Sequence, residues 1–426
     1  MSRRVPLRAA ALAGLLSVLT FAGTAAASGT FVQPVHVLAA FHGPTTGQGA
    51  YFGWAVSGLD DINGDGVADL IVGEVNGGAN LRGRVWVYSG ATGHLIYREV
   101  GRDNDQNGYA IADAGDVNGD GVPDLISGAP NVGSAVGHAY VYSGATGKVL
   151  ARLHGHLPGD QFGAAVSGAG DLNRDGHGDL LVGAPGSGNP GTAPGRVYVI
   201  SGRTFHVMRV LSAGHLGDSF GAGTASTGDL NGDGVPDMVI GANRAGPNRG
   251  GAAYVYSGKT GARLFRIPGE RGSVEFSRFF VAGVGDTNGD GVPDIYVGDY
   301  ASNNRGAAGG FAAVYSGVDG TRLHAWRGAA GDGLGPGRGA GDVNGDGKTD
   351  LIIGSYTNSD GASQAGKVQV VSGATGHVLR TITSTTPNEN LGFDAVGVGD
   401  VNGNGSIDYL LSAASLDTVY LVDGRR

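Results

Sequence analysis

The chain has 426 residues, of which 84 are glycine and 16% are charged, and its formal net charge is −9. The glycine content excludes a helical protein, the lack of a three-residue glycine period excludes collagen, and a hydrophobic share of 41% excludes a disordered chain. The sequence has no cysteine for a disulfide framework and no basic stripe for nucleic acid. Short runs of valine, leucine, isoleucine and tyrosine between glycine-rich turns indicate an all-β protein.

The first 27 residues differ from the rest and are typical of a secretory signal peptide. Three arginines lead into an apolar stretch from Ala9 to Phe21, and Ala25-Ala26-Ala27 supplies small residues for cleavage. The apolar stretch is too short to span a membrane, and no longer one follows it. We therefore expect residues 1–27 to be removed and residues 28–426 to form one secreted, extracellular domain without a membrane span.

The first element expected in the mature chain is a strand from Val35 to His42, followed by a series of repeat units. A nine-residue acidic pattern, D-x-N-x-[DN]-G-x-x-D, marks each unit. Seven copies at intervals of 55 to 58 residues fill the mature chain, and they begin at Asp61, Asp116, Asp171, Asp229, Asp286, Asp342 and Asp400.

Each unit contains four expected strands in the same order. A first strand ends in Gly-Asp, the acidic loop follows, and a second strand such as DLLVGAP (179–185) runs into a variable segment. A third strand such as GRVYVI, a turn such as SGATG and a fourth strand such as HVLRTI complete the unit. Seven units of four strands predict a seven-bladed β-propeller. Because only two strands follow the seventh loop, we predict that the N-terminal strand completes the last blade and closes the ring.

Two short motifs flank the acidic loops at fixed positions. Phe-Gly precedes the first strand at residues 52–53, 162–163 and 220–221, and Gly-Ala-Pro ends the second strand at residues 128–130 and 183–185. Together with the spacing, these motifs make residues 35–426 resemble FG-GAP repeats, the blades of the integrin α-subunit head and of many secreted bacterial proteins. The resemblance implies the propeller fold and calcium in the acidic loops. Two units depart from it, because Ser277-Arg278 and Gly333-Leu334 stand where Phe-Gly is expected.

The residue types of the acidic loops independently favour calcium, because oxygen-only ligands on a tight turn suit a hard cation of that size. In the first loop we expect the side chains of Asp61, Asn63, Asp65 and Asp69 to converge on an ion with the carbonyl of Val67. An EF-hand would require an acidic residue at the twelfth position. That position holds Val72, Ser127, Val182, Ile240, Val297, Ile353 and Leu411 in the seven loops.

We predict up to seven structural calcium ions, held by the same five positions of each loop. The predicted ligands are Asp61, Asn63, Asp65, Val67, Asp69, Asp116, Asn118, Asp120, Val122, Asp124, Asp171, Asn173, Asp175, His177, Asp179, Asp229, Asn231, Asp233, Val235, Asp237, Asp286, Asn288, Asp290, Val292, Asp294, Asp342, Asn344, Asp346, Lys348, Asp350, Asp400, Asn402, Asn404, Ser406 and Asp408. Asn404 lacks a charge and Arg174 opposes the ion, so the seventh and third sites should bind more weakly than the first.

Other motifs are weaker. Residues 217–221 match the nucleophile string G-x-S-x-G but lack its strand–turn–helix context, so we expect no catalytic residue there. His154 and His156 alternate along a strand; they could be metal ligands on one side of it or ordinary strand-end histidines. Aromatic residues recur on the third strands, where packing between blades explains them: Trp86, Tyr140, Tyr198 and Tyr254.

The topology places the acidic loops and the SGATG-type turns on one face, and the variable segments and blade-to-blade links on the other. Variation confined to one rim of a fixed scaffold predicts recognition there. We predict a secreted, monomeric module for adhesion or ligand binding, which recognises a protein or glycan and is not an enzyme. A propeller enzyme such as a polysaccharide lyase and an envelope scaffold protein remain as alternatives. The rim groups most able to bind are Arg102, Asp103, Asp105, Asp160, Glu270, Arg271, Tyr300, Arg305 and Tyr356.

Overall fold

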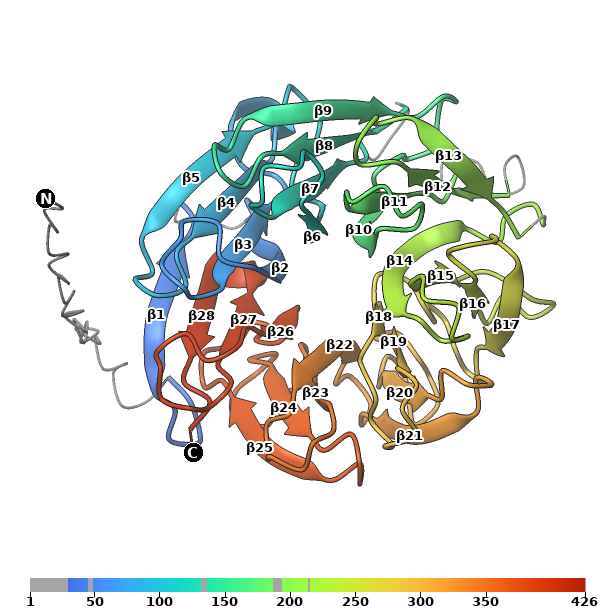
Figure 1. Cartoon of the computed structure of the whole chain (residues 1–426). Helices are drawn as coiled ribbons and strands as arrows, with labels where there is room; N and C mark the ends of the chain where they lie inside the picture. The colour runs from blue at the N-terminus through green and yellow to red at the C-terminus, as the bar shows by residue number, and fades with distance from the viewer. Residues whose placement is uncertain (1–29, 45–48, 132–135, 187–193, 214, 426) are drawn as a thin grey trace, which may run out of the picture.

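The computed structural model describes residues 30–44, 49–131, 136–186, 194–213 and 215–425, so the expected signal peptide lies outside the described residues. The described residues form seven four-stranded antiparallel sheets arranged as blades around a central opening (Figure 1). Their helical content is two short 3₁₀ turns, η1 (Ala79–Leu81) and η2 (Ala414–Leu416). No helix within these residues is long and apolar enough to cross a membrane. The predicted all-β, seven-bladed propeller is confirmed.

In the first six blades the strands run outward from the central opening in chain order. The strands of the first four blades are β2 (Phe52–Leu59), β3 (Asp69–Glu74), β4 (Arg84–Tyr88) and β5 (Leu95–Val100); β6 (Ala110–Gly115), β7 (Asp124–Ala129), β8 (His138–Tyr142) and β9 (Val149–His154); β10 (Ala165–Gly170), β11 (Asp179–Ala184), β12 (Arg196–Ile200) and β13 (Val207–Leu211); β14 (Phe220–Gly228), β15 (Asp237–Ala242), β16 (Ala252–Tyr256) and β17 (Arg263–Pro268). The last three blades contain β18 (Val281–Gly283), β19 (Ile295–Asp299), β20 (Phe311–Tyr315) and β21 (Arg322–Arg327); β22 (Leu334–Gly341), β23 (Asp350–Ser355), β24 (Lys367–Val371) and β25 (Val378–Thr383); β26 (Ala395–Gly397), β27 (Tyr409–Ala413), β28 (Thr418–Val422) and β1 (Val37–His42).

The N-terminal strand β1 is the outermost strand of the last blade, where it pairs antiparallel with β28. Phe41 lies opposite Val419 in this pair, and the side chains of Val37, Leu38 and Phe41 are buried. The two ends of the described chain therefore share one sheet, and the predicted closure of the ring by the N-terminal strand is confirmed.

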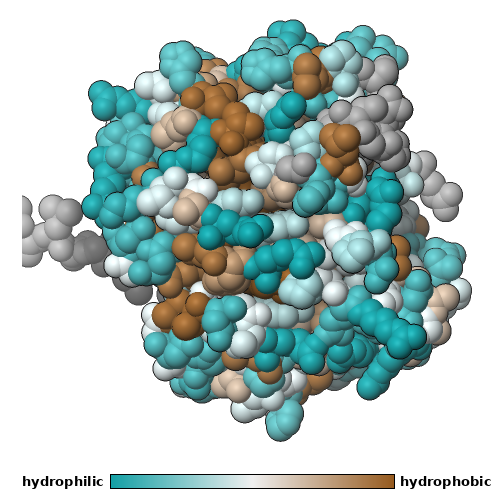
Figure 2. Space-filling model, turned by 90° about the vertical axis from the view of Figure 1, so that its right-hand side faces the viewer, coloured by the Kyte–Doolittle hydropathy of each residue, from teal (hydrophilic) through white to brown (hydrophobic). Residues whose placement is uncertain are grey.

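The hydrophobic core lies between the blades, with one cluster of buried side chains at each junction. Second strands such as β3 and β15 are buried along their whole length because neighbouring blades cover both of their faces. Fourth strands such as β17 expose most of their residues on the outer wall. On the side of the ring that bears β13 and β17 this wall is largely hydrophilic, with hydrophobic side chains in separate patches (Figure 2).

The Phe-Gly and Gly-Ala-Pro motifs meet where one blade touches the next. A Cβ atom added to Gly183 would lie 2.1 Å from the carbonyl oxygen of Gly221 in the following blade, so only glycine allows this backbone contact. At the junction that closes the ring, Ser412 occupies the position that Gly183 has in the third blade. Its hydroxyl donates a hydrogen bond to the carbonyl oxygen of Gly53, which joins the last blade to the first.

The structure corrects the expected position of the Phe-Gly motif in the fifth blade. Phe276 and Ser277 occupy it, so the assignment to Ser277-Arg278 is wrong by one residue. A Cβ atom at Gly241 would lie 1.9 Å from the carbonyl oxygen of Ser277, the contact that the glycine of the motif makes at other junctions. One extra residue between the motif and the acidic loop causes the error. Ser277 has a φ of +66°, in the left-handed region that the glycine of the motif occupies in the other blades.

In the sixth blade, Leu334 and Gly335 occupy the motif position, so the assignment to Gly333-Leu334 is also wrong by one residue. Leu334 bridges to Gly310 as Phe220 bridges to Gly195. The cause is the reverse of that in the fifth blade, because one residue is missing between this motif and the acidic loop. Counting backward from a loop locates the motif only where the first strand keeps its usual length.

Candidate functional site

Each acidic loop is held by hydrogen bonds from its own backbone to its first aspartate. In the first loop, Asp61 Oδ1 accepts the N–H groups of Asn63, Gly64 and Asp65 at 2.7 to 3.2 Å, and its Oδ2 accepts that of Gly66 at 2.7 Å. Burial raises the pKa of Asp61, but these four N–H groups outweigh it and lower the pKa overall. Gly66 has a positive φ of +85°, which glycine adopts without strain. The turn thus points a row of N–H groups at one ionised carboxylate.

The ninth position of each loop is a buried aspartate that ties the loop to the outer turn of the same blade. Asp69 is fully buried, and its carboxylate accepts the N–H of Ile62 at 3.0 Å and that of Gly90 in the SGATG turn at 3.1 Å. Burial raises the pKa of Asp69 to about 6, to which the charges of Asp65 and Asp61 contribute. The glycine-to-aspartate bond recurs in all seven blades, which confirms that both kinds of turn lie on one face.

The remaining side-chain oxygens of the first loop lie close together but are hydrogen-bonded to the protein. Asn63 Nδ2 donates to both carboxylate oxygens of Asp69, at 3.0 and 3.3 Å, while its Oδ1 accepts the N–H of Asp65. The Ser89 hydroxyl donates to Asp65 Oδ2 at 3.1 Å. In the described part of the chain, no three acidic or histidine side chains converge closely enough to hold a metal ion. In this arrangement Asn63 turns its Nδ2 toward Asp69. For Asn63 to be a ligand with Asp69, its amide would have to rotate so that Oδ1 lies on that side.

Three loops depart from this pattern, and two of them link neighbouring blades. Arg174, at a position that is glycine in the other loops, has a φ of +61° and reaches out of the third loop to donate to the carbonyl of Asp233 in the fourth. Lys348 of the sixth loop donates to the carbonyl of Asn288 in the fifth. In the seventh loop the amide of Asn404 donates to Asp423 at 3.0 Å. The charge of Arg174 therefore lies beside the fourth loop as well as its own.

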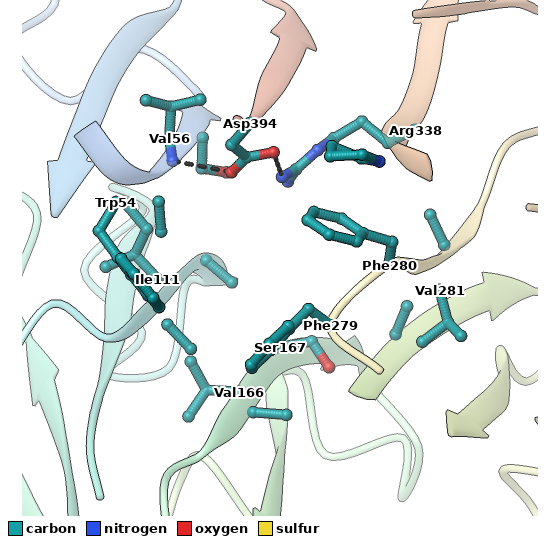
Figure 3. A pocket seen from close by; sticks show the side chains of 18 of the residues that line it. Trp54, Val56, Ile111, Val166, Ser167, Phe279, Phe280, Val281, Arg338 and Asp394 are labelled. Carbon is teal, nitrogen blue, oxygen red and sulfur yellow. Dashed lines mark hydrogen bonds and ion pairs between the residues drawn. The ribbon is translucent and has the colours of Figure 1, made fainter. Parts of the chain in front are cut away.

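The opposite face has a cavity of about 430 Å³ at the centre of the ring. Seven aromatic side chains line it and form a closed circuit of ring contacts with centroid separations of 5.0 to 6.3 Å. We call them the aromatic girdle: Trp54, Tyr109, Phe279, Phe280, Tyr300, Tyr356 and Phe393. Figure 3 shows Trp54, Phe279 and Phe280 around the cavity, together with the valines and Ser167 of the inner strands that also line it.

Three of the seven girdle residues come from one position of the repeat, the residue directly after Phe-Gly. Trp54, Tyr109 and Phe393 stand there in the first, second and seventh blades. The third and fourth blades have alanine at this position, and the fifth has Arg278. The N–H of Arg278 donates to the carbonyl of Glu275 at 3.0 Å, as the N–H of Trp54 donates to the carbonyl three residues before it. Sequence analysis missed this position, although its aromatic residues were visible once the motif had been aligned.

One ion pair packs against the aromatic girdle, and a second belongs to the lining of the cavity. Arg278 lies with its guanidinium 4.8 Å from the ring centre of Phe279 and 3.2 Å from the carboxylate of Glu275. Burial alone lowers the pKa of Arg278, but Tyr300, Glu275 and Tyr109 outweigh it and raise the pKa.

The second ion pair crosses three blades. Arg338 in β22 contacts Asp394 Oδ1 at 2.5 Å, and Asp394 Oδ2 accepts the N–H of Val56 at 3.0 Å (Figure 3). Arg338 Nε is buried and has no hydrogen-bond partner among the described residues. Arg278 and Arg338 thus each face a carboxylate, and Arg338 Nε remains a buried donor without a partner among the described residues.

The structure separates the predicted rim groups into three kinds. Tyr300 and Tyr356 belong to the girdle. Asp105 and Asp160 are buried and serve the fold, since Asp105 accepts the hydroxyl of Tyr140 and Asp160 lies 3.7 Å from Arg196. Their prediction as binding groups is wrong, because charge alone in a link does not reveal burial. The remaining groups lie on the surface or at a second hollow: Arg102, Asp103, Glu270, Arg271 and Arg305.

The second hollow lies near the outer edge of the same face, beside the fifth blade. Glu270, Arg271, Asn303, Asn304 and Arg327 line it. Glu270 is paired with Arg322 and with Arg327, the latter at 2.7 Å. Asn304 Nδ2 is buried without a partner within the described residues. This polar hollow offers amide and guanidinium donors beside one carboxylate.

The two weaker motifs do not form sites. His154 Nδ1 lies 3.0 Å from Nδ1 of His138, whereas the ring of His156 packs toward Tyr198 at 6.0 Å. The suggested pair of His154 and His156 is therefore not brought together. Residues 217–221 lead into strand β14 rather than a helix, as expected for a segment of the repeat. The third-strand aromatics are buried at the junctions, which confirms their role in blade packing.

Comparison with family models gives matches along much of the ring. FG-GAP repeats match residues 108–149, 162–200, 220–256 and 339–371, and an FG-GAP-like repeat matches residues 61–127. The first four blades and the sixth are thus matched in whole or in part.

Among curated proteins, integrin alpha pat-2 of Caenorhabditis elegans is 32% identical over 228 residues, which cover 47% of this chain and 18% of that protein. Integrin alpha-5 of Xenopus laevis is 33% identical over 215 residues, covering 46% and 20%. Phosphatidylinositol-glycan-specific phospholipase D of Bos taurus is 32% identical over 261 residues, covering 53% and 28%. The chain spans less than a third of the length of each of these relatives.

Among solved structures, BBS1N in its complex with ARL6DN superimposes with a TM-score of 0.58 at 12% identity, covering 93% of this chain and 98% of that one. This likeness concerns the fold alone.

Proposed function

Since the chain is a β-propeller of FG-GAP repeats, we propose that it is a ligand-binding module that recognises a protein or glycan through the face opposite the acidic loops. The observation that carries the proposal is the difference between the faces. On the acidic face the buried carboxylates are engaged by backbone N–H groups in every blade. On the opposite face, two hollows open among residues that differ from blade to blade.

The polar hollow beside the fifth blade is the part of this face best suited to a protein or glycan. Arg271 is exposed there, and Asn304 offers a buried amide without a partner within the described residues. Amide and guanidinium groups donate to hydroxyl and carbonyl oxygens, which both peptides and sugars present. An unpaired buried donor costs free energy until a ligand supplies an acceptor. Binding here therefore satisfies a group that the fold leaves unpaired.

We propose that this recognition takes place outside the cell, after removal of residues 1–27, and that it serves adhesion. The support is the signal-like N-terminal sequence and the similarity to integrin α-subunits. The matched relatives are several times longer than this chain, so their partners and assemblies do not transfer with the repeat.

We propose further that the acidic loops bind calcium as a structural ion. Each loop supplies carboxylate, amide and carbonyl oxygens, the donors that calcium prefers. Asp69 is fully buried near two other carboxylates, an arrangement that a divalent cation would stabilise. Positions one, three, five, seven and nine of each loop would hold the ion. Bound calcium would neutralise the clustered carboxylates and fasten the two turns of each blade to each other.

An enzyme is the second candidate, because one relative is named a phospholipase D. The propeller covers 28% of that protein, and the name says nothing of which part is catalytic. A polysaccharide lyase would need an acid and a base at the polar hollow, where Glu270 is already paired with two arginines. Release of unsaturated sugars from polysaccharides on incubation with the protein would favour this candidate over a binding module.

The test of the proposed function compares the two faces. Purified protein comprising residues 28–426 should be applied to a glycan array and to a panel of immobilised extracellular proteins. We expect binding that Arg271→Ala and Asn304→Ala each weaken at least tenfold. Lys259→Ala, which removes an exposed cation from a turn of the acidic face, should bind like the wild type. Equal losses with Lys259→Ala, or binding unaffected by both rim variants, would contradict the proposed face.

A further inference from the structure

We infer that the central cavity is a binding site for a small, uncharged aromatic molecule that carries one oxygen acceptor. This site goes beyond the proposed function, which concerns macromolecules at the rim. Its volume of about 430 Å³ lies in the range of roughly 300 to 1,000 Å³ that is usual for small-molecule pockets. The aromatic girdle forms its walls, so an aromatic guest can make the edge-to-face contacts that the girdle residues make with one another.

The aromatic girdle is already in contact with a cation of the protein itself, the guanidinium of Arg278. Arg278 lies over the ring of Phe279, and it also contacts Tyr109 by a hydrogen bond. Because Glu275 neutralises Arg278, the pair leaves no net charge to attract an ion. A cationic guest would find the Arg278 guanidinium already on a ring of the girdle and Arg338 in the lining, and an anionic guest would meet the carboxylate of Asp394. A charged guest would also lose its hydration without gaining a partner.

Of the polar side chains that line the cavity, Arg338 is the one with a buried donor that lacks a partner within the described residues. Ser167 Oγ and Thr224 Oγ1 lie 3.3 Å apart and are bonded to each other, and Ser57 donates to the carbonyl of Gly58. Arg338 Nε is buried without a partner among the described residues, although its Nη2 is paired with Asp394. A hydroxyl or carbonyl oxygen on the guest would accept from this Nε. A guest that is apolar throughout would leave the donor unsatisfied.

The experiment uses four naphthalenes of nearly equal size, whose fluorescence reports binding to the purified protein of residues 28–426. The probes are 2-naphthalenemethanol (neutral, one oxygen), 2-methylnaphthalene (neutral, no oxygen), 2-naphthylmethylamine (cationic) and 2-naphthoate (anionic). We expect the alcohol to bind most tightly and both ions at least tenfold more weakly. The methyl compound should lie between them. Equal or tighter binding of either ion, or no saturable binding of the alcohol, would overturn the inference.

Two pairs of variants locate the site. Arg278→Met leaves the carboxylate of Glu275 without its cation and frees the face of the Phe279 ring, so the cationic probe should gain at least tenfold in affinity while the alcohol changes less than threefold. Arg98→Met is the matched control, because Arg98 also lies over an aromatic ring, that of Trp86 at 4.9 Å, but on the outer wall.

Ala164→Phe places in the third blade the aromatic group that three other blades have at this position, and it should fill the cavity and abolish binding of the alcohol. Ala222→Phe makes the same change in the fourth blade at a residue that does not line the cavity, and it should retain binding. Should either phenylalanine variant fail to fold, the probe series and Arg278→Met still decide the case. Unchanged binding in a folded Ala164→Phe would contradict the central site. Macromolecular binding at the rim is measured independently, so either proposal can fail alone.

Discussion

The two faces of the ring are built from the same repeat but differ in how closely each blade follows it. On the acidic face, the bond from the outer-turn glycine to the buried aspartate recurs seven times with lengths of 2.8 to 3.1 Å. On the opposite face, the residue after Phe-Gly is aromatic in three blades and Arg278 in the fifth. The comparison teaches that strict repetition marks the part that holds the ring together. Departures from the repeat, on a scaffold that is otherwise uniform, mark where recognition can occur.

The largest loss of stability should come from removing the N-terminal strand β1, which completes the last blade. Deletion of residues 28–43 removes β1 from the last blade and exposes its partner β28 as a free edge. Loss of the buried Val37, Leu38 and Phe41 side chains costs about 1.5–3 kcal/mol each. We therefore expect the free energy of unfolding to fall by several kcal/mol and the melting temperature to fall by roughly ten degrees or more. A truncated protein that melts within a degree or two of the mature one would show that the ring does not depend on this strand.

Calcium should act on the acidic face and on stability as a whole. At a tenfold excess over a dissociation constant of about 10⁻⁴ to 10⁻³ M, each occupied site adds on the order of 1.4 kcal/mol. We expect chelation to lower the melting temperature by many degrees and Asp65→Ala to remove one such increment. Thermal melts with calcium and with chelator, together with elemental analysis of bound calcium, measure both effects. No bound calcium and an unchanged melting temperature would refute the proposal for all seven loops.

The seventh loop offers a sharper version of the same experiment. Asn404→Asp adds a ligand charge, but it also removes the amide that donates to Asp423 and places two carboxylates side by side. We therefore expect the variant to be less stable than the wild type in chelator by about 1 kcal/mol and to gain more from calcium. A variant that is destabilised equally with and without calcium would show that position five of this loop does not meet an ion.

The contacts between neighbouring blades give a further prediction about stability, which does not depend on either face of the ring. Gly183→Ala would bring a Cβ atom to 2.1 Å from the backbone carbonyl of Gly221, which has no side chain that can move aside. We expect a loss of about 3 kcal/mol. Ser412→Ala at the closing junction removes only a hydroxyl that bonds to Gly53, so it should cost about 1 kcal/mol. Chemical denaturation of both variants tests the difference, and the reverse order would contradict the contact described for the motif.

The smallest predicted effect is a loss of stability as the pH falls below neutral. Burial, followed by the charge of Arg152, lowers the pKa of His138 to about 4, although Asp105 opposes the shift. Because this folded-state pKa is below the unfolded value, the contribution of His138 to stability is present above pH of about 6.5 and is lost as the pH falls toward 4. Between pH 7 and pH 4.5, the free energy of unfolding of His138→Gln should therefore fall by about 1 kcal/mol less than that of the wild type. Melting curves at the two values check this, and parallel losses would exclude the assignment.

The sequence was sufficient for the architecture because the repeat fixes it. The spacing of the acidic pattern and the missing last strand predicted seven blades and their closure by β1, and both are confirmed. Seven buried aspartates on one face followed from the same repeat. The Phe-Gly position was misplaced in two blades because one strand gained a residue and another lost one. The girdle as a whole was missed because its residues come from five different blades and meet only when the ring closes. Asp105 and Asp160 were misjudged because their burial depends on partners in other strands, Tyr140 and Arg196.

Hydrogen exchange of the mature protein with and without excess calcium tests most directly the division of roles between the faces. We predict slower exchange in the seven acidic loops, such as residues 61–69, and in the outer turns, such as residues 89–93, on addition of calcium. Segments of the opposite face, such as residues 270–279 and 300–306, should exchange at the same rate in both conditions. Unchanged exchange in the acidic loops, or equal protection of both faces, would contradict the account of one face as a calcium-fastened scaffold and the other as the site of recognition.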